Sequence, residues 1–311
     1  MEMREIEIFR AVMHARSTGK AGALLGISQP AVSQSIKKLE TESELRLFER
    51  VRGRLVPTQE ANALLVEVDL CFAGFENIKH RIRSLRGFGL LRLSIASYPA
   101  LGTGFMARAI AAFEPERRGI AMSLQIMSSR EVHQSVSSGR VDFGLMADEL
   151  AVTGLESSEF MSLPGVIVMA SRHPLARKAL LDPKDLTEHP FIALNPEDAG
   201  RGRLERLLRT LKLELKPIIE TPFASSVCEL ALRGVGIGMA NPIVALDYAE
   251  RGLLLKPMSV DVRLACLLIF RAGVPLSENA RFLLSVMRIQ MQRDIERLQE
   301  LLAEKNSKQQ R

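Results

Sequence analysis

Tryptophan is missing from this 311-residue chain, and cysteine is scarce, with only Cys71, Cys228 and Cys266. Three widely separated cysteines cannot all pair within one chain, so they provide no disulfide framework, and we expect reduced thiols in a cytoplasmic protein. Long hydrophobic runs are also missing, since none approaches the ~20 residues that a membrane-crossing helix needs. The charged start of the chain lacks the pattern of a signal peptide.

Motifs for metal binding and catalysis are missing as well. The five histidines are scattered, without a His-x-x-x-His or Cys/His cluster, so the sequence predicts no metal site. There is no Gly-x-Ser-x-Gly elbow and no phosphate loop, and the glycine-rich run at 234–239 lacks the dinucleotide-binding spacing. We therefore expect no cofactor and no enzymatic activity, although a catalytic site assembled in three dimensions leaves no such local motif.

The charge balance favours a polyanionic partner only weakly. The formal net charge is +6, but the first sixty residues carry ten Lys and Arg against eight Asp and Glu. A basic protein is attracted to nucleic acid, yet an excess this small does not identify one. Any case for DNA binding must come from the patterning of the chain.

Three helices are predicted within the first 45 residues. Apolar residues at helical spacing predict one helix over 3–15 and a shorter one over 18–25, followed by a turn at Gly26. Ser28 is a good N-cap for a third helix, because its hydroxyl can accept from the first turn, and Pro30 fits that turn without losing a hydrogen bond. The expected buried stripe of this third helix is Ala31, Val32, Ile36 and Leu39.

Two helices joined by a glycine-containing turn, the second with a polar outer face, are typical of a helix-turn-helix. The second helix of such a unit enters the major groove, where Gln can pair with adenine and Lys can reach guanine or phosphate. The residues predicted to contact DNA from this helix are Ser28, Gln29, Pro30, Ser33, Gln34 and Lys37. The alternative is a surface helix with a solvated polar face, and periodicity alone does not separate the two.

A β-hairpin is predicted next, around Gly53. Arg50, Arg52 and Arg54 lie on and beside this turn, where their guanidinium groups could clamp phosphates or enter a minor groove. Exposed arginines occur on many hairpins, but next to a candidate recognition helix they favour a DNA-binding wing.

These residues together resemble the N-terminal signature of LysR-type transcriptional regulators over about 60 residues. The chain departs from the family pattern at Arg16 and Glu44, where glycine is usual, and at Gly22, where alanine is usual. Residues 57–61 resemble the branch that includes opine-catabolism regulators. The matching positions are Phe9, Val12, Ala21, Leu25, Ser28, Gln29, Pro30, Ala31, Val32, Ser33, Ile36, Leu39, Glu40, Leu47, Phe48 and Arg50.

A long helix is predicted from residue 58 to 85, where proline is absent and apolar residues recur at alternating spacings of three and four. The stripe is Ala61, Leu64, Val68, Cys71, Phe75, Ile78, Ile82 and Leu85. It could pack on its own domain or on a second chain; we favour a homodimer, because two recognition helices can read a two-fold site. The LysR-type resemblance implies the same role, and implies that homotetramers are common.

From residue 90 strands alternate with helices, which predicts mostly parallel sheets covered by helices. We expect two similar α/β lobes with two crossovers, resembling a periplasmic binding protein, as the LysR-type resemblance also implies. A last helix is expected from 278 to 304. The predicted domains are a winged helix-turn-helix at 1–58, a linker helix and hinge at 59–88, and an effector-binding domain at 89–311, with lobe I at 89–163 and 262–311 and lobe II at 164–261.

Small polar residues follow the predicted strands of both lobes, where ligands bind in open α/β sheets. Each could simply cap a helix, but together they predict a cleft suited to a carboxylate or amino-acid-like effector. Asp148, Glu197 or Asp198 could meet an amine on such a ligand, although the favoured interpretation is that these three residues lie in solvated loops. The predicted effector-binding residues are Ser97, Tyr98, Thr103, Ser128, Ser129, Asn195, Ser225, Ser226 and Asn241.

The sequence thus predicts a transcription regulator that binds double-stranded promoter DNA and a small-molecule effector. One alternative is a solute-binding or enzymatic α/β protein with an incidental helical N-terminal domain. Another is a nonspecific DNA-compacting protein, against which the low local charge argues. Sequence-selective DNA binding separates these classes.

Overall fold

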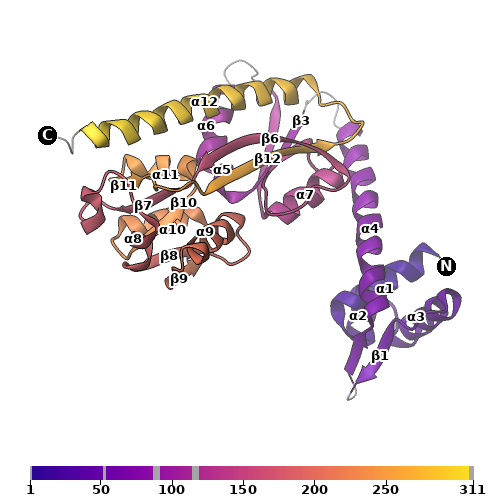
Figure 1. Cartoon of the computed structure of the whole chain (residues 1–311). Coiled ribbons are helices and arrows are strands. Elements are labelled where there is room, and N and C mark those ends of the chain that lie inside the picture. Colours follow the sequence, from indigo (N-terminus) through magenta and orange to yellow (C-terminus); the bar gives the residue numbers. More distant parts are fainter. Residues whose placement is uncertain (1, 52–53, 87–91, 114–118, 308–311) are drawn as a thin grey trace. The chain divides into compact units, whose positions relative to one another are not determined.

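The computed structural model describes residues 2–51, 54–86, 92–113 and 119–307 (Figure 1). It divides into two compact units, residues 1–86 and 87–311, which are described separately below. No helix among the described residues is both long enough and apolar enough to cross a membrane.

The first unit is a three-helix bundle with a hairpin and a long helix. It contains α1 (Met3–Ala15), α2 (Thr18–Leu25), α3 (Gln29–Ser43), the antiparallel strands β1 (Phe48–Val51) and β2 (Arg54–Pro57), and α4 (Gln59–Arg86). Phe9, Val12, Val32 and Leu39 are buried between the helices and hold the bundle together.

Local signals in the sequence set the end of α2 and the start of α3. The Ser28 side chain accepts a hydrogen bond from the Ala31 N–H, and Gly26 ends α2 in the left-handed conformation that glycine adopts without strain. The prediction that Ala31 belongs to the buried stripe is wrong, because its side chain is exposed. The core side of α3 is set by Val32, Ile36 and Leu39, and Ala31 lies just outside that stripe.

The second unit contains two five-stranded mixed sheets. The first has the order β4-β3-β5-β12-β6 and the second β11-β7-β10-β8-β9. In each sheet three neighbouring strands are parallel, β4-β3-β5 in the first and β10-β8-β9 in the second, so their carboxyl ends share one edge.

The lobe built on the first sheet is made of β3 (Arg92–Ser97), α5 (Pro99–Gly102), α6 (Gly104–Phe113), β4 (Ala121–Ile126), α7 (Ser129–Ser137), β5 (Phe143–Ala147), β6 (Leu155–Pro164), β12 (Arg263–Arg271) and α12 (Glu278–Ser307). The other lobe is made of β7 (Val166–Ala170), the 3-10 turn η1 (Pro174–Arg177), α8 (Pro183–Thr187), β8 (Phe191–Leu194), α9 (Ala199–Thr210), β9 (Pro217–Thr221), α10 (Ala224–Leu232), β10 (Ile237–Ala240), α11 (Pro242–Ala249) and β11 (Leu253–Lys256). The chain crosses between the lobes twice, after β6 and before β12. This is the two-lobed α/β architecture that the sequence predicts.

The last helix, α12, runs across both lobes (Figure 1). It packs on α6 and on α11, and one continuous hydrophobic core joins residues of both lobes beneath it. Arg108 of α6 forms ion pairs with Asp247 of α11 and with Asp294 of α12, the latter at 2.7 Å. Asp294 is 3% exposed, so this network anchors α12 from the inside.

Candidate DNA-binding surface and effector cleft

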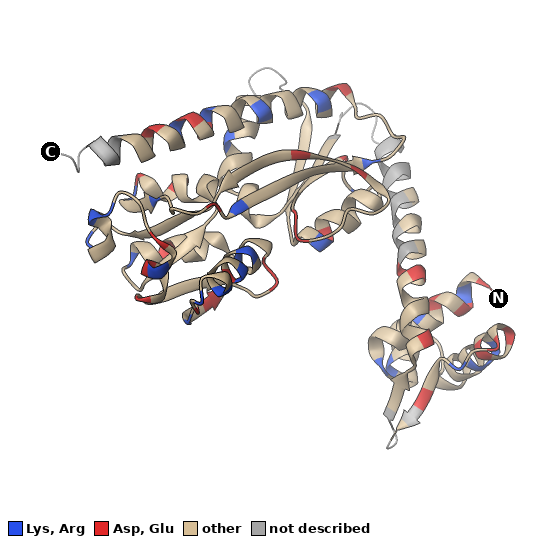
Figure 2. Ribbon diagram, viewed as in Figure 1, with Lys and Arg blue, Asp and Glu red and all other residues tan. Residues whose placement is uncertain are grey.

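The outer face of α3 carries the polar residues that the sequence assigns to DNA contact. Ser28, Gln29, Pro30, Ser33, Gln34 and Lys37 are all exposed. The neighbouring Lys38 forms ion pairs within its own unit, because its ammonium group lies 2.5 Å from Glu5 and 3.7 Å from Glu42. Basic and acidic residues therefore both lie on α3 (Figure 2), whereas its first two turns, residues 29–36, carry uncharged residues only.

The hairpin is attached to α3 by a carboxylate. Glu40 Oε1 accepts hydrogen bonds from the backbone N–H groups of Leu47 at 2.7 Å and Phe48 at 3.0 Å. The start of β1 is thereby fixed to α3, which is how a wing is positioned beside a recognition helix. Of the three arginines expected in the wing, Arg52 lies outside the described residues, and the side chains of Arg50 and Arg54 are likewise not described.

The apolar stripe of α4 has two kinds of environment. Ala61 and Val68 are buried against α1–α3, and Asp69 accepts from Arg10 at 2.6 Å. Phe75 and Ile78, further along the same stripe, are 47% and 57% exposed. The side chains of Ile82 and Leu85 lie outside the described part of the chain. Ala61 and Val68 thus pack within their own unit, whereas Phe75 and Ile78 present apolar surface.

A cavity of about 670 Å³ lies between the two lobes of the second unit. The carboxyl ends of the parallel strands and the N-termini of α7, α9, α10 and α11 surround it, which is the usual ligand position in such sheets. Among the predicted effector-binding residues, those that line the cavity are Tyr98, Thr103, Ser128, Ser129, Ser225 and Asn241. The structure does not bring Ser97, Asn195 or Ser226 to the cavity wall.

Ser97, Asn195 and Ser226 are each next in sequence to a lining residue, but they are not themselves part of the cavity lining. Ser97 is fully buried, and its hydroxyl donates to the Tyr98 carbonyl. Side chains alternate between the two faces of a strand, so a small polar residue at a strand end can point away from the cleft. Asn195 and Ser226 are half-buried outside the lining.

Several lining residues also cap helices. The Ser128 hydroxyl and the Glu131 side chain form a capping box at α7, and Asn241 Oδ1 accepts from the Ile243 N–H at 3.0 Å. Ser129 Oγ accepts from the Ala147 N–H at 3.2 Å. The start of α10 differs, because its N-cap is Phe223 and no side chain caps it. Ala224 and Ser225 of this turn line the cavity, so the positive end of α10 faces the ligand space.

Acidic groups outnumber cations around the cavity. Glu131, Asp148, Glu149 and Asp198 line it, and Arg203 is the only Lys or Arg among the described lining residues. Asp148 and Asp198 belong to the set predicted to meet an amine, whereas Glu197 is not part of this lining. Sequence reasoning missed Glu149, which lies in the turn after β5, and Arg203, which reaches the cleft from the second turn of α9, because no local pattern marks either position.

The environment of the cleft shifts the pKa of two of these carboxyls. Burial raises the pKa of Asp198, and the nearby charge of Asp148 adds to that effect, while hydrogen bonds from the start of α9 act against it. Partial desolvation raises the pKa of Glu149, although its side chain still reaches solvent. A cation placed in the cleft therefore stabilises the charged form of both carboxylates.

Comparison with known proteins decides the family. The helix-turn-helix model of bacterial regulatory proteins of the lysR family matches residues 3–62, and the LysR substrate binding domain matches residues 89–292. The chain belongs to the LysR family of transcriptional regulators. The predicted family and function class are confirmed, as is the fold class of helix-turn-helix plus two-lobed α/β domain.

Named relatives agree with this assignment. The transcriptional activator protein LysR of Escherichia coli (strain K12) is 37% identical over 84% of each chain. The octopine catabolism/uptake operon regulatory protein OccR of Rhizobium meliloti is 29% identical over 84% of this chain and 86% of its own. The crystal structure of CbnR, a LysR family transcriptional regulator, has a TM-score of 0.63 at 17% identity, covering 93% of this chain and 99% of that one. The expected likeness to opine-catabolism regulators is confirmed.

Proposed function

We propose that this LysR-type regulator reads promoter DNA with the first two turns of α3 and that a small molecule in the inter-lobe cleft alters that binding. The observation that carries the DNA part is the exposed set of Gln29, Ser33 and Gln34 on a helix whose opposite face is fixed in the core. Gln and Ser are residue types that read base edges in the major groove.

The test is binding of the full chain to the DNA just upstream of its own gene. Because a bidentate base contact contributes about 1–3 kcal/mol, we expect Gln29→Ala to weaken binding by about tenfold or more, and Ser33→Ala, which loses a single hydroxyl contact, to weaken it less. Gln292→Ala, an exposed glutamine of α12 in the other unit, is the matched control and should bind as the unmodified chain does. Unchanged binding by both α3 variants would remove α3 from the recognition surface.

We further propose a three-part organisation and a homodimer, with pairing through the apolar surface of α4. Phe75 and Ile78 lie about one turn apart on α4 with exposed fractions of 47% and 57%, and a second copy of α4 can bury this apolar surface. The helix-turn-helix would occupy residues 1–58, the linker 59–88 and the effector-binding domain 89–311. A regulator of this kind acts where promoter DNA is, in the cytoplasm, and we propose a binding function rather than catalysis for the cleft.

For the effector we propose an amino-acid-like compound with a carboxylate and a cationic nitrogen. The uncapped first turn of α10, with the Ser225 hydroxyl, suits the carboxylate. Asp148, Glu149 and Asp198 suit the cation on the same ligand. The name of the relative OccR refers to octopine, which combines carboxylates with cationic nitrogens.

Calorimetric titration tests this class of ligand. The probes are octopine and the twenty common L-amino acids, each amino acid compared with its deaminated acid and its decarboxylated amine. We expect the best probe to need both groups, with a loss of at least tenfold when either is removed. Binding of neutral aromatic compounds in place of any carboxylate would contradict the proposal.

A further inference from the structure

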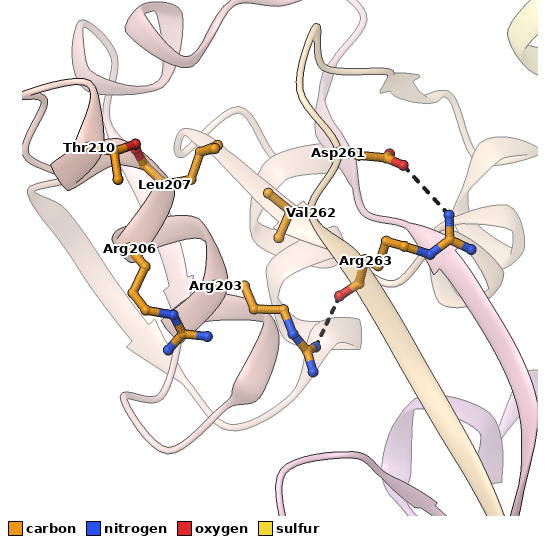
Figure 3. Close-up of a pocket in the computed structure, with 7 residues that line it drawn as sticks. All are labelled: Arg203, Arg206, Leu207, Thr210, Asp261, Val262 and Arg263. Atoms are coloured by element: carbon orange, nitrogen blue, oxygen red, sulfur yellow. Dashed lines mark hydrogen bonds and ion pairs between the residues drawn. The ribbon is translucent and has the colours of Figure 1, made fainter.

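One ion pair crosses the effector cleft. Arg203, on α9 of the second lobe, contacts Asp148, which follows β5 in the first lobe, and both residues line the cavity. The Arg203 guanidinium also donates to the Arg263 carbonyl at 3.0 Å, at the start of the crossover strand β12 (Figure 3). A single side chain therefore connects α9, the end of β5 and the crossover.

The pair is accessible to exchange. The side chains of Arg203 and Asp148 are 30% and 23% exposed, and an ion pair in contact with water is weaker than a dry one, because solvent screens it and hydrates both partners. A soluble cation that enters the cleft meets the same carboxylate that Arg203 occupies.

The four carboxylates of the cleft are not equally free to receive that cation, and one of them, Glu149, is hydrogen-bonded to Ser129. Glu131 completes the capping box of α7, and Asp198 caps α9 through the Arg201 N–H at 2.8 Å. Asp148 caps no helix and is held by the side chain of Arg203. Replacing one cation by another at Asp148 therefore costs no helix cap.

We propose that the cationic nitrogen of the effector replaces Arg203 on Asp148, so that Arg203 is an internal competitor that sets affinity and selectivity; this rests on the effector cleft proposed above. Asp148 is then the residue that recognises the cation. Arg203 does not bind the effector's carboxylate, because Asp148 already pairs with its guanidinium, whereas the uncapped start of α10 offers the anion a positive end.

The exchange also gives the effector a means of control. The Arg203–Asp148 contact joins the two lobes, so a ligand that breaks it favours arrangements in which α9 and the end of β5 are no longer tied. A ligand shifts an equilibrium only through such a difference in affinity between two arrangements.

The experiment uses the full chain, octopine and the L-amino acids with their deaminated counterparts as probes, and calorimetry as readout. Arg203→Met keeps the stem and removes the charge; we expect ammonium-bearing probes to bind at least tenfold more tightly and deaminated probes to be unaffected. Asp148→Asn should weaken the same probes at least tenfold. In the Asp148→Asn background, Arg203→Met should no longer tighten binding, since the carboxylate for which the two cations compete is gone.

Two control variants separate competition from a structural effect. Arg206→Met, one turn further along α9 and outside the lining of this cavity, should bind as the unmodified chain does. Arg203→Lys keeps the positive charge and should stay close to the unmodified affinity. A melting curve for each variant confirms that it is folded.

The proposal is overturned if Arg203→Met weakens binding or leaves it unchanged, or if no probe binds either the unmodified chain or Arg203→Met. Failure of the DNA-binding proposal is seen separately, as a loss of preference for the upstream DNA without any probe, and it leaves these titrations interpretable.

Discussion

At the scale of single residues, two positions where LysR-type sequences usually have glycine carry long side chains here. Arg16 ends α1 with a φ of 49°, and Glu44 ends α3 with a φ of 56°. The left-handed region costs a non-glycine residue roughly 1–2 kcal/mol, because the Cβ atom crowds the backbone. The backbone therefore adopts the left-handed conformation at both positions, although neither residue is the glycine that adopts it without strain.

Glu44→Gly should therefore stabilise the first unit by up to about 1 kcal/mol, since part of the relief is lost to the greater freedom of glycine in the unfolded chain. Hydrogen exchange of α3 amides in the full chain measures this. Glu42→Gly, two residues earlier and inside α3, is the control and should destabilise by about 1 kcal/mol. Equal protection in Glu44→Gly and the unmodified chain would show that the turn is not strained.

The three cysteines should differ in reactivity. Cys71 is exposed, whereas Cys228 and Cys266 are buried, and burial raises the pKa of the Cys228 thiol to about 12. Because the thiolate is the reactive form, an alkylating reagent at about pH 8 should leave Cys228 and Cys266 unmodified in the folded protein, and any labelling should fall on Cys71. Mass spectrometry of the digested protein reads the sites. Labelling of Cys228 at the rate of Cys71 would contradict the burial described here.

Acid should weaken effector binding before it protonates ordinary carboxyls. The pKa values of Asp198 and Glu149 are raised, mainly by desolvation. As the pH falls through these raised values, the two carboxylates lose their charge, so the attraction for a cationic nitrogen falls, while the folded chain itself is relieved of an unfavourable charge. Calorimetry of the best ammonium-bearing probe across a pH series should show affinity falling as the pH is lowered, with the fall beginning above the range in which ordinary carboxyls titrate, and falling less steeply in Glu149→Gln. A flat profile would mean that these carboxylates are remote from the ligand.

At the scale of elements, the sequence predicted the amphipathic helices of the first unit well. Apolar residues at helical spacing are buried in α1 and α3, and the expected ranges of α1 and α2 match the structure. Strand β6 was missed, because four successive residues, 156–159, are exposed and polar and the strand is held by pairing with β12, which lies about a hundred residues later. A pairing partner that distant leaves no local pattern.

The candidate site divides in the same way. Ser128 and Asn241 could be found because a cap residue after a strand is a local signal. Arg203 could not, because its role depends on Asp148 in the other lobe. The sequence also could not tell which half of the α4 stripe packs within its own unit, since Val68 and Ile78 are both apolar.

Pairing through α4 leads to a prediction at this scale. Ile78→Glu places a charge on the uncovered stripe and should convert the dimer into monomer, because burying an unpaired carboxylate costs several kcal/mol. Val66→Glu is the matched control: it is also exposed on α4 but off the stripe, and it should leave the dimer intact. Sedimentation measures both. A dimer that survives Ile78→Glu would locate the interface elsewhere.

At the scale of the whole molecule, each of the two units has its own hydrophobic core and its own kind of candidate binding surface. The first presents a polar helix face and a hairpin tied to α3 through Glu40. The second encloses a charged cavity between lobes that α12 and the Arg108 network hold from the other side. Regulation requires that occupancy of the cavity change how the first unit meets DNA.

The most direct test of the central claim is the affinity of the full chain for the DNA upstream of its own gene and for a scrambled copy, measured across a salt series. Contacts with phosphate weaken steeply with salt on both DNAs, whereas base contacts remain. The account predicts tighter binding to the upstream DNA, with a preference that persists at high salt. Equal affinity for both DNAs at every salt concentration would contradict sequence-selective recognition and leave the cleft as the main functional feature of the chain.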